Sequence, residues 1–231
     1  MSENGTLLRQ ENTLPIGFPN KTGGAPLRRV VFGRRMNGDD KIKVEDSPES
    51  ELVTQKNLLL ARTTIVEFGA EQRAPFLDEL LELTRADRED LIETYNAYMK
   101  RTQGTRRAEE LDGERLKLGF GWKVGDDVFD VVVLCDKSNL ITGYDEIPIE
   151  DTSTGSYEWA CKILVSDIRR LEQTGGGGKT FSETVTLDML RTVDATDLNA
   201  MLLFHQKRGR NFRLARKQVA ADDGAGSSTD S

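Results

Sequence analysis

Hydrophobic and polar positions along the chain follow patterns typical of strands and patterns typical of helices, and these patterns occur in the same order in both halves. In the second half, a largely apolar run over residues 116–124 is followed by a Gly-Asp-Asp turn and a second apolar run over residues 128–134. Two such runs around a Gly/Asp turn predict a β-hairpin. The first half has a matching pair of valines at positions 30–31, after a longer turn over residues 19–26 that is rich in Gly, Pro and Asn.

Helical periodicity follows each hairpin. Apolar residues spaced by three and four predict one helix over residues 48–68 and a corresponding one over residues 155–173. Ser47-Pro48-Glu49 suits a helix start, because proline is tolerated in the first turn and acids favour the positive end of the helix dipole. A shorter amphipathic segment over residues 76–83 leads to a second main helix that starts near Asp87. The sequence thus predicts an α+β fold, in which a β-hairpin precedes two main helices.

The two halves align with an almost constant offset. A Gly-x-Asp loop is predicted in both halves: Gly38 and Asp40 stand 105 positions before Gly143 and Asp145, and the register continues without a gap into the first helix. After a slip of two residues, the offset is 107 over the second helix. Chance similarity between two amphipathic segments would not keep both the order of elements and the offset. We therefore predict a tandem duplication of one small unit.

Paired aspartates begin the second main helix in each half, where Asp87 and Asp90 match Asp194 and Asp197. An aspartate at the cap position satisfies free backbone N–H groups, and a second acid suits the helix dipole; Thr84 offers an alternative cap one turn earlier. The other interpretation is a metal or acid–base site, but a metal needs several ligands that converge on one point, and no further ligand points there. The residues predicted to be helix caps or a signature of the fold are Gly38, Asp40, Asp87, Asp90, Gly143, Asp145, Asp194 and Asp197.

The pattern divides the chain into five parts. Repeat units are predicted over residues 14–104 and 118–214, and a highly charged linker over residues 105–117 joins them. Residues 1–13 and 215–231 lack such a pattern, so a disordered N-terminal arm and a disordered C-terminal tail are expected.

Composition narrows the class of protein. The chain has 231 residues, a net charge of −7 and a pI near 5.0, whereas a surface that binds phosphates is basic, so nucleic acid is not the expected partner. No apolar run is long enough to span a bilayer, and the N-terminus lacks the plan of a signal peptide. We therefore expect a cytoplasmic protein without a membrane partner. Cys135 and Cys161 each lie in an apolar stretch and form no metal-binding spacing, so buried thiols are expected.

Two features could carry chemistry, and each lacks part of what that chemistry needs. The segment 175–180, Gly-Gly-Gly-Gly-Lys-Thr, resembles the end of a phosphate-binding loop, but the motif needs a glycine where Gln173 stands, and a helix rather than a strand is predicted before it. His205 is the only histidine, so it forms no histidine-based zinc site and lacks a recognisable catalytic partner. A nucleotide-dependent enzyme is the alternative that the loop leaves open. We predict no enzyme activity, no cofactor and no small-molecule substrate, with the loop as a connector.

Two surfaces are candidates for binding a partner. The apolar face of the first main helix is only partly apolar in the first half, and a basic run follows the second main helix near the C-terminus. Basic side chains suit an acidic protein partner, and with neighbouring aromatic residues they also suit RNA, so an RNA-binding regulator is an alternative. The candidate partner-binding residues are Leu52, Leu59, Val66, Arg208, Arg210 and Arg213.

Three short motifs in the first half resemble those of a phage protein family. They are Leu14-Pro15-Ile16-Gly17, then Arg34 or Arg35 with Gly38 and Asp40, and Leu83-Thr84-Arg-Ala-Asp87-Arg88-Glu-Asp90-Leu91. Together they are similar to motifs of the baseplate hub assembly chaperones of contractile phage tails and of phage-tail-like injection systems. The match covers residues 14–104 and extends to the second half only through the repeat. Many relatives carry a Cys-x-x-Cys segment near the place of residues 116–134, and this chain lacks it.

The resemblance implies a role without catalysis. Such proteins help to assemble the tail baseplate or hub by binding other tail components, so the expected partners are tail or baseplate proteins. The alternative is a permanent structural component of the baseplate, which would place the chain in the assembled tail particle. Two similar units fit either role, because they can engage repeated partners at a raised effective concentration.

Overall fold

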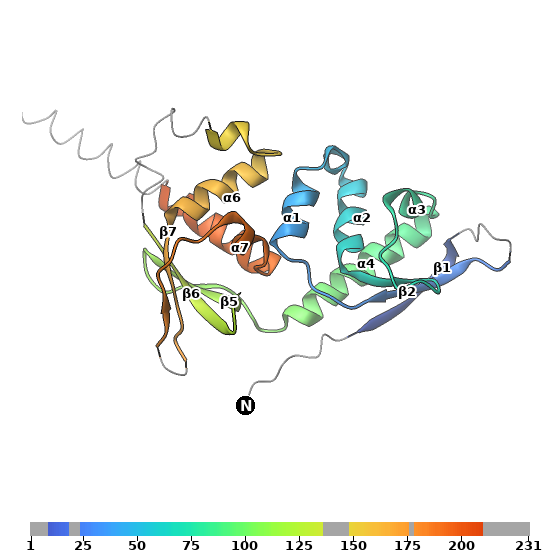
Figure 1. Ribbon diagram of the computed structural model, residues 1–231. Coiled ribbons are helices and arrows are strands. Elements are labelled where there is room, and N and C mark those ends of the chain that lie inside the picture. The colour runs from blue at the N-terminus through green and yellow to red at the C-terminus, as the bar shows by residue number, and fades with distance from the viewer. Residues whose placement is uncertain (1–8, 19–23, 136–147, 176–177, 210–231) are drawn as a thin grey trace, which may run out of the picture. The chain divides into compact units, whose positions relative to one another are not determined.

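The computed structural model divides the chain into two compact units, each with helices and an antiparallel sheet (Figure 1). The predicted α+β fold class is therefore confirmed. Unit 1 comprises Met1–Arg107 and Arg191–Ala195, and unit 2 comprises Ala108–Leu190 and Thr196–Ser231. The residues that the structure describes are 9–18, 24–135, 148–175 and 178–209.

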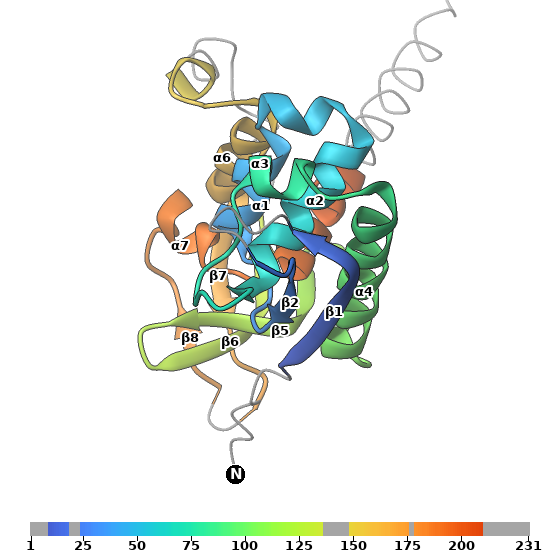
Figure 2. The same ribbon diagram turned by 90° about the vertical axis from the view of Figure 1, so that its right-hand side faces the viewer.

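Unit 1 is a three-stranded antiparallel sheet with helices packed against it (Figure 2). Its elements are β1 (Gln10–Phe18), β2 (Leu27–Phe32), α1 (Gly38–Glu45), the 3-10 helix η1 (Pro48–Glu51), α2 (Val53–Thr64), β3 (Ile65–Phe68), α3 (Leu77–Leu81) and α4 (Arg85–Gln103). The strands lie in the order β1-β2-β3, α4 packs along β1, and α2 packs against α4. Leu14 of β1, Phe32 of β2, Leu58 of α2 and Tyr98 of α4 are fully buried in the core between them.

Unit 2 contains a five-stranded antiparallel sheet in the order β4-β5-β6-β7-β8. Its elements are β4 (Glu109–Glu110), β5 (Arg115–Val124), β6 (Asp127–Leu134), α6 (Ser156–Asp167), β7 (Ile168–Glu172), β8 (Thr180–Phe181), α7 (Leu187–Arg191) and a helical segment over residues 195–209, which we call the last helix. Trp122, Leu134, Leu164 and Leu198 are almost completely buried in its core. The two-residue strands β4 and β8 form the edges of this sheet.

Both units follow one order of elements: an antiparallel strand pair, a helix that leads directly into a third strand, a short helix and a long helix. The starts of α2 and α6 are 103 residues apart (53 and 156), and those of α3 and α7 are 110 residues apart (77 and 187). Both sheets also shift register within the first strand pair and near the end of the second strand. The predicted offsets of 105 and 107 are therefore wrong by two and three residues, and the duplication itself stays a prediction.

The first main helix is shorter than predicted in each unit. α2 ends at Thr64 and α6 ends at Asp167, and the following residues form β3 and β7 instead of a further helical turn. The run Thr63-Thr64-Ile65-Val66 is β-branched, which favours a strand, and β2 offers it an antiparallel partner. The predicted helices over residues 48–68 and 155–173 are thus wrong at their C-terminal ends, and the first is also wrong at its start, where the separate 3-10 helix η1 precedes α2.

Two further predictions are corrected by the backbone. The sequence places Gly38 in a loop, but Gly38 begins α1, because the residue before it caps that helix with its side chain. Its predicted counterparts, Gly143 and Asp145, lie outside the described residues. The predicted linker over residues 105–117 contains β4 and the first residues of β5, because α4 ends at its C-cap Gly104 and the chain re-enters a sheet soon after.

The predicted N-terminal arm is shorter than expected. Residues 1–13 show no hydrophobic pattern, yet β1 begins at Gln10 and pairs with β2 from that residue onwards. Pairing with a neighbouring strand satisfies the backbone whatever the polarity of the side chains, so a polar stretch can still form a strand. The predicted tail over residues 215–231 lies outside the described residues.

A glycine allows the irregularity of β1. Gly17 has a φ of +92° where the register with β2 shifts, and Gly121 has a φ of +78° at the matching shift in β5. A Cβ atom at Gly17 would lie 2.6 Å from Cγ of Arg28 and 2.7 Å from the carbonyl oxygen of Leu27. We expect Gly17→Ala to lower the free energy of unfolding by about 2–4 kcal/mol, because it combines backbone strain with atomic overlap. Urea unfolding measures this loss.

Gly113→Ala is the matched control for this substitution. A Cβ atom at Gly113 has no neighbour within 4 Å, so its free energy of unfolding should stay within about 0.5 kcal/mol of the unsubstituted protein. An equal loss in both variants would contradict the role that we assign to Gly17.

Candidate functional site

A buried carboxylate joins the start of α4 to the irregular part of β1. Asp87 is fully buried, and its Oδ1 accepts hydrogen bonds from the backbone N–H of Ile16 at 2.8 Å and of Gly17 at 3.2 Å. Its Oδ2 accepts the hydroxyl of Thr84 at 2.8 Å. The carboxylate thus supplies acceptors to backbone donors at the point where the ladder with β2 is irregular.

An arginine binds carbonyl groups of the same strand segment. Nε of Arg28, on β2, donates to the carbonyl oxygen of Leu14 at 2.7 Å, and Nη2 donates to that of Pro15 at 2.5 Å. We call residues 14–17 the β1 bulge. Its carbonyl groups are therefore held by an arginine from one side, and its N–H groups by an aspartate from the other.

The electrostatics of Asp87 follow from these contacts. Burial by itself raises the pKa of the carboxyl, because it penalises the charged form. The N–H groups of Ile16 and Gly17, the hydroxyl of Thr84 and the charge of Arg28 together outweigh burial, so the pKa lies below its usual range. Asp87 is therefore charged in the folded protein at neutral pH.

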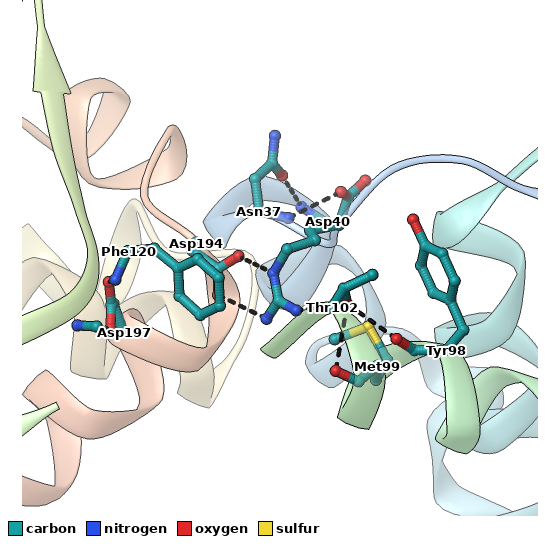
Figure 3. A network of polar contacts seen from close by, with 10 residues as sticks. Asn37, Asp40, Tyr98, Met99, Thr102, Phe120, Asp194 and Asp197 are labelled. Carbon is teal, nitrogen blue, oxygen red and sulfur yellow. Dashed lines mark hydrogen bonds and ion pairs between the residues drawn. The ribbon is translucent and has the colours of Figure 1, made fainter. Parts of the chain in front are cut away.

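Unit 2 contains the corresponding contact. Asp197 is fully buried in the first turn of the last helix, and it accepts hydrogen bonds from the backbone N–H of Gly119 and of Phe120, each at 2.8 Å (Figure 3). Both units therefore attach the start of their longest C-terminal helix to the first long strand by a carboxylate that accepts two successive N–H groups.

The donors differ by one position between the units, and a proline accounts for the difference. Gly17 and Gly121 occupy the same place in their strands, 104 positions apart. With this offset, Pro15 corresponds to Gly119. Proline has no N–H group, so the carboxylate in unit 1 takes the next pair of donors, those of Ile16 and Gly17.

The paired aspartates of unit 1 are not the N-caps that the sequence predicts. The alternative cap, Thr84, is confirmed: its side chain accepts the backbone N–H of Asp87, the third residue of the helix, at 3.2 Å. Asp90 instead accepts the side-chain amide of Asn12 on β1 at 2.8 Å. Because a hydroxyl caps the helix, both carboxylates are available to contact the strand.

The cluster of unit 1 around Arg35 includes a residue from the C-terminal half of the sequence (Figure 3). Nε of Arg35 donates to Oδ2 of Asp194 at 2.7 Å, and Nη1 donates to Oγ1 of Thr102 at 2.7 Å. Asp194 belongs to residues 191–195, which are part of unit 1. The two charged side chains are about 10% exposed (11% and 10%), and periodicity gives no signal for an ion pair between residues 159 positions apart.

Asp40 fixes the start of α1. Its carboxylate accepts the backbone N–H of Asn37 at 3.1 Å, while the side chain of Asn37 accepts the N–H of Asp40 in return (Figure 3). Nη1 and Nη2 of Arg34 donate to both carboxylate oxygens of Asp40, at 2.7 and 2.8 Å. The predicted signature residues at this place therefore act as a helix cap and not as a ligand site.

His205 pairs with a buried carboxylate that the sequence does not single out. Its Nε2 lies 2.8 Å from Oδ2 of Asp167, whose side chain is 2% exposed. The carbonyl oxygen of Asp167 accepts the backbone N–H of Cys135 at 2.7 Å. Neither cysteine is part of a disulfide; Cys161 is buried as predicted, whereas Cys135 is only partly buried. In the described part of the chain, no three His, Cys, Asp or Glu side chains gather as a metal site requires.

The glycine-rich segment connects two strands. β7 precedes it and β8 follows it, so the helix predicted before it is wrong. The backbone N–H of Gln173 donates to the carbonyl oxygen of Lys179 at 2.9 Å, and Nζ of Lys179 pairs with Asp127 of β6 at 2.6 Å. The lysine that would contact a phosphate in a nucleotide site is therefore paired with a carboxylate.

Large hydrophobic side chains are exposed on the helical side of unit 1. Leu52 and Val53, at the start of α2, are 61% and 76% exposed, and Phe76 and Leu81, at the two ends of α3, are 60% and 37% exposed. The guanidinium of Arg73 lies 4.7 Å from the ring centroid of Phe76. Among the described residues, no helix is both long and apolar enough to cross a membrane.

The three apolar residues predicted to bind a partner do not lie on one helix face. Leu52 is exposed, but Leu59 is partly buried on α2, and Val66 lies on β3 rather than on a helix. Arg208 is partly buried, with Nη1 3.5 Å from the carbonyl oxygen of Cys135. The other two predicted residues, Arg210 and Arg213, lie outside the described residues.

The hydrogen bonds of Asp87 predict that the Asp87→Asn substitution lowers the stability and changes how the stability depends on pH. Asp87→Asn removes the negative charge and replaces Oδ2, which accepts the hydroxyl of Thr84, by an NH2 group that cannot accept a hydrogen bond, so we expect a loss of about 2–3 kcal/mol at neutral pH. Because the pKa of Asp87 is lower in the folded state, its contribution is present above the unfolded pKa of about 4 and is lost as the pH falls through the folded pKa. Below about pH 4, the unsubstituted protein should therefore lose stability more steeply than the variant.

Urea unfolding across this pH range tests both statements. Asp78→Asn is the control, because Asp78 is an exposed acid on α3, and it should change the free energy of unfolding by less than about 0.5 kcal/mol. A parallel pH profile for the Asp87→Asn variant and the unsubstituted protein would show that the Asp87 carboxylate does not carry the contact.

Comparison with known proteins found no relative of this chain. No protein-family model, no curated protein and no solved structure matches the chain. The residues and contacts described above are therefore the basis on which a function is inferred.

Proposed function

We propose that this protein is a non-enzymatic assembly chaperone, which acts in the cytoplasm on the baseplate or hub of a contractile phage tail or of a phage-tail-like injection system. It would act by binding other tail proteins. The exposed hydrophobic side chains of unit 1 are the observation that carries the proposal, and the motifs shared with the hub assembly chaperones give it its direction.

The exposed side chains suit a protein partner. Leu52, Val53, Phe76 and Leu81 are all large and apolar, and each is exposed by at least 37%. Burial of apolar surface against a partner gains about 25 cal/mol for each Å² removed from water. Such side chains on helices are typical of surfaces that become covered in a complex.

The motifs of the resemblance support the assignment because their residues contact one another. Residues 14–17 of the first motif form the β1 bulge, and Asp87 of the third motif binds the N–H groups of that bulge. In the second motif, Arg34 holds Asp40 at the start of α1. Residues that must fit each other are a stronger basis for a resemblance in fold than scattered identities would be.

The test is reconstitution with defined partners. The chain is co-expressed with whichever tube, hub, spike and tape-measure proteins its neighbouring genes encode, and stable complexes are measured by size-exclusion chromatography with light scattering. We expect a complex with a hub or baseplate protein, and only traces of the chain in mass spectra of finished particles. Stoichiometric amounts there would favour a permanent structural component. Failure to bind any of these proteins would contradict both roles.

The exposed residues at the start of α2 provide a sharper prediction. We expect Leu52→Ser combined with Val53→Ser to weaken the complex at least about tenfold, because each side chain loses the apolar area that a partner would cover. Both residues are exposed in the free protein, so the free energy of unfolding should change little. Isothermal titration calorimetry measures the affinity. Leu203→Ser, at a residue of the last helix that is 59% exposed, is the control and should bind as the unsubstituted protein does.

A further inference from the structure

The two units differ in what lies along the outer edge of their first long strand. In unit 2, β4 pairs antiparallel with β5 at Leu116 and Lys117. In unit 1, β1 is the end of its sheet, and within the described residues no strand lies beyond it. With the offset of 104, the paired residues of β5 correspond to Asn12 and Thr13 of β1. The place that β4 fills in unit 2 therefore has no strand in the described part of unit 1.

An edge strand of this kind can pair with a further strand. Its outward N–H and C=O groups can form hydrogen bonds with another extended segment. We call residues 10–13 the β1 edge. Glu11 and Thr13 are exposed there, and Asn12 is partly buried. The β1 bulge that follows is occupied by Asp87 and Arg28, so an added strand would be confined to the four residues of the β1 edge.

Acidic side chains lie beside the β1 edge, and the two bases next to it, Arg9 and Arg29, are already paired with carboxylates. Glu11 is 58% exposed, with Oε1 3.1 Å from Nε of Arg29. On α4, Asp90 contacts Asn12 of the edge. Glu93 follows three residues later, on the same side of the helix, and is exposed. An extended segment along the β1 edge would therefore meet carboxylates from both the strand and the helix.

In unit 2, the long helix and the strand at the corresponding edge carry opposite charges that pair with each other. Nζ of Lys207, on the last helix, pairs with Oε2 of Glu110 on β4 at 2.6 Å. The acid is on the added strand, and the base is on the helix. The long helices start 110 residues apart (85 and 195), so Ala97 takes the place of Lys207 in α4, and the charged α4 side chains beside the β1 edge that are named above, Asp90 and Glu93, are acids. A strand added to β1 should therefore carry basic side chains, whereas β4 carries an acid at this place.

We propose that the β1 edge is a strand-addition site for an extended, basic segment of a partner protein. The segment would take the position along β1 that β4 takes along β5, and its Lys or Arg side chains would face Glu11 and Glu93. The site follows from the contacts of unit 1, and it rests on the proposed function only for the source of the partner, a tail protein.

The probe is a synthetic peptide of threonine and valine with two adjacent lysines, so that one lysine faces each side of the sheet; the same peptide with glutamate in place of lysine is its control. Hydrogen exchange of the full chain is measured with and without each peptide. We expect the basic peptide to slow exchange at residues 10–13 and the acidic peptide to have no effect. Glu11→Lys combined with Glu93→Lys should weaken binding at least about tenfold. Glu51→Lys makes the same charge change at an exposed residue of η1 and should leave binding unchanged.

Several results would overturn the proposal. Equal binding of both peptides would remove the charge argument, and protection elsewhere would remove the site. A dimer that the Glu11→Lys, Glu93→Lys variant dissociates would make a second copy the occupant. Slow exchange at the β1 edge in the free chain, lost when residues 1–8 are deleted, would assign the edge to the chain's own N-terminus.

The site and the proposed function can fail separately. If a tail protein binds but leaves exchange at the β1 edge unchanged, the strand-addition site is wrong and the proposed function remains. If the basic peptide protects the β1 edge but no tail protein binds, the site remains and the proposed function is wrong.

Discussion

The contact between a buried aspartate and two strand N–H groups determines how unit 1 is built. At the β1 bulge the ladder with β2 is irregular, and a buried N–H group without an acceptor costs about 1–3 kcal/mol. Asp87 supplies that acceptor, and because it is the third residue of α4, it also fixes where the helix begins on the sheet. Thr84 makes this possible by capping the helix. Gly17, one of the two donors to Asp87, has a positive φ, and a Cβ atom there would overlap with Leu27 and Arg28.

The order of elements could be predicted from the sequence, because it depends on local periods. The strand pair, the two main helices and the short helix between them all follow from hydrophobic spacing. The third strand could not be predicted in this way. Ile65–Phe68 continues the apolar spacing of α2, so the pattern alone extends the helix. What ends the helix is pairing with β2, whose residues lie more than 30 positions earlier. Dependence on local patterns also explains why the predicted offsets are wrong by two and three residues. Two amphipathic segments still match when one of them is shifted along the other by a short step or by one helical turn.

For the candidate site, the sequence likewise predicts which residues matter to the fold but not which distant residues they contact. The sequence identifies Asp40, Asp87 and Asp197 as requirements of the fold, Asp40 because the repeat aligns it with Asp145, and the other two because they stand at a predicted helix start. It does not show that Asp87 reaches Gly17, 70 residues away, or that Asp194 meets Arg35, because a partner distant in the sequence leaves no local pattern. The helix predicted through Val66 is wrong for the same reason, since residues 65–68 pair with β2 of the sheet.

The difference between the units is therefore more informative about function than their similarity. Contacts present in both, such as the carboxylates of Asp87 and Asp197, are explained by the folding of each unit. Unit 2 completes its own sheet with β4 and matches the charge of β4 with Lys207. Unit 1 has a sheet end without such a strand in its described part, acids beside it, and apolar side chains exposed on its helices. If two units share a fold and one of them satisfies its edge internally, selection for binding can act on the other without a loss of stability.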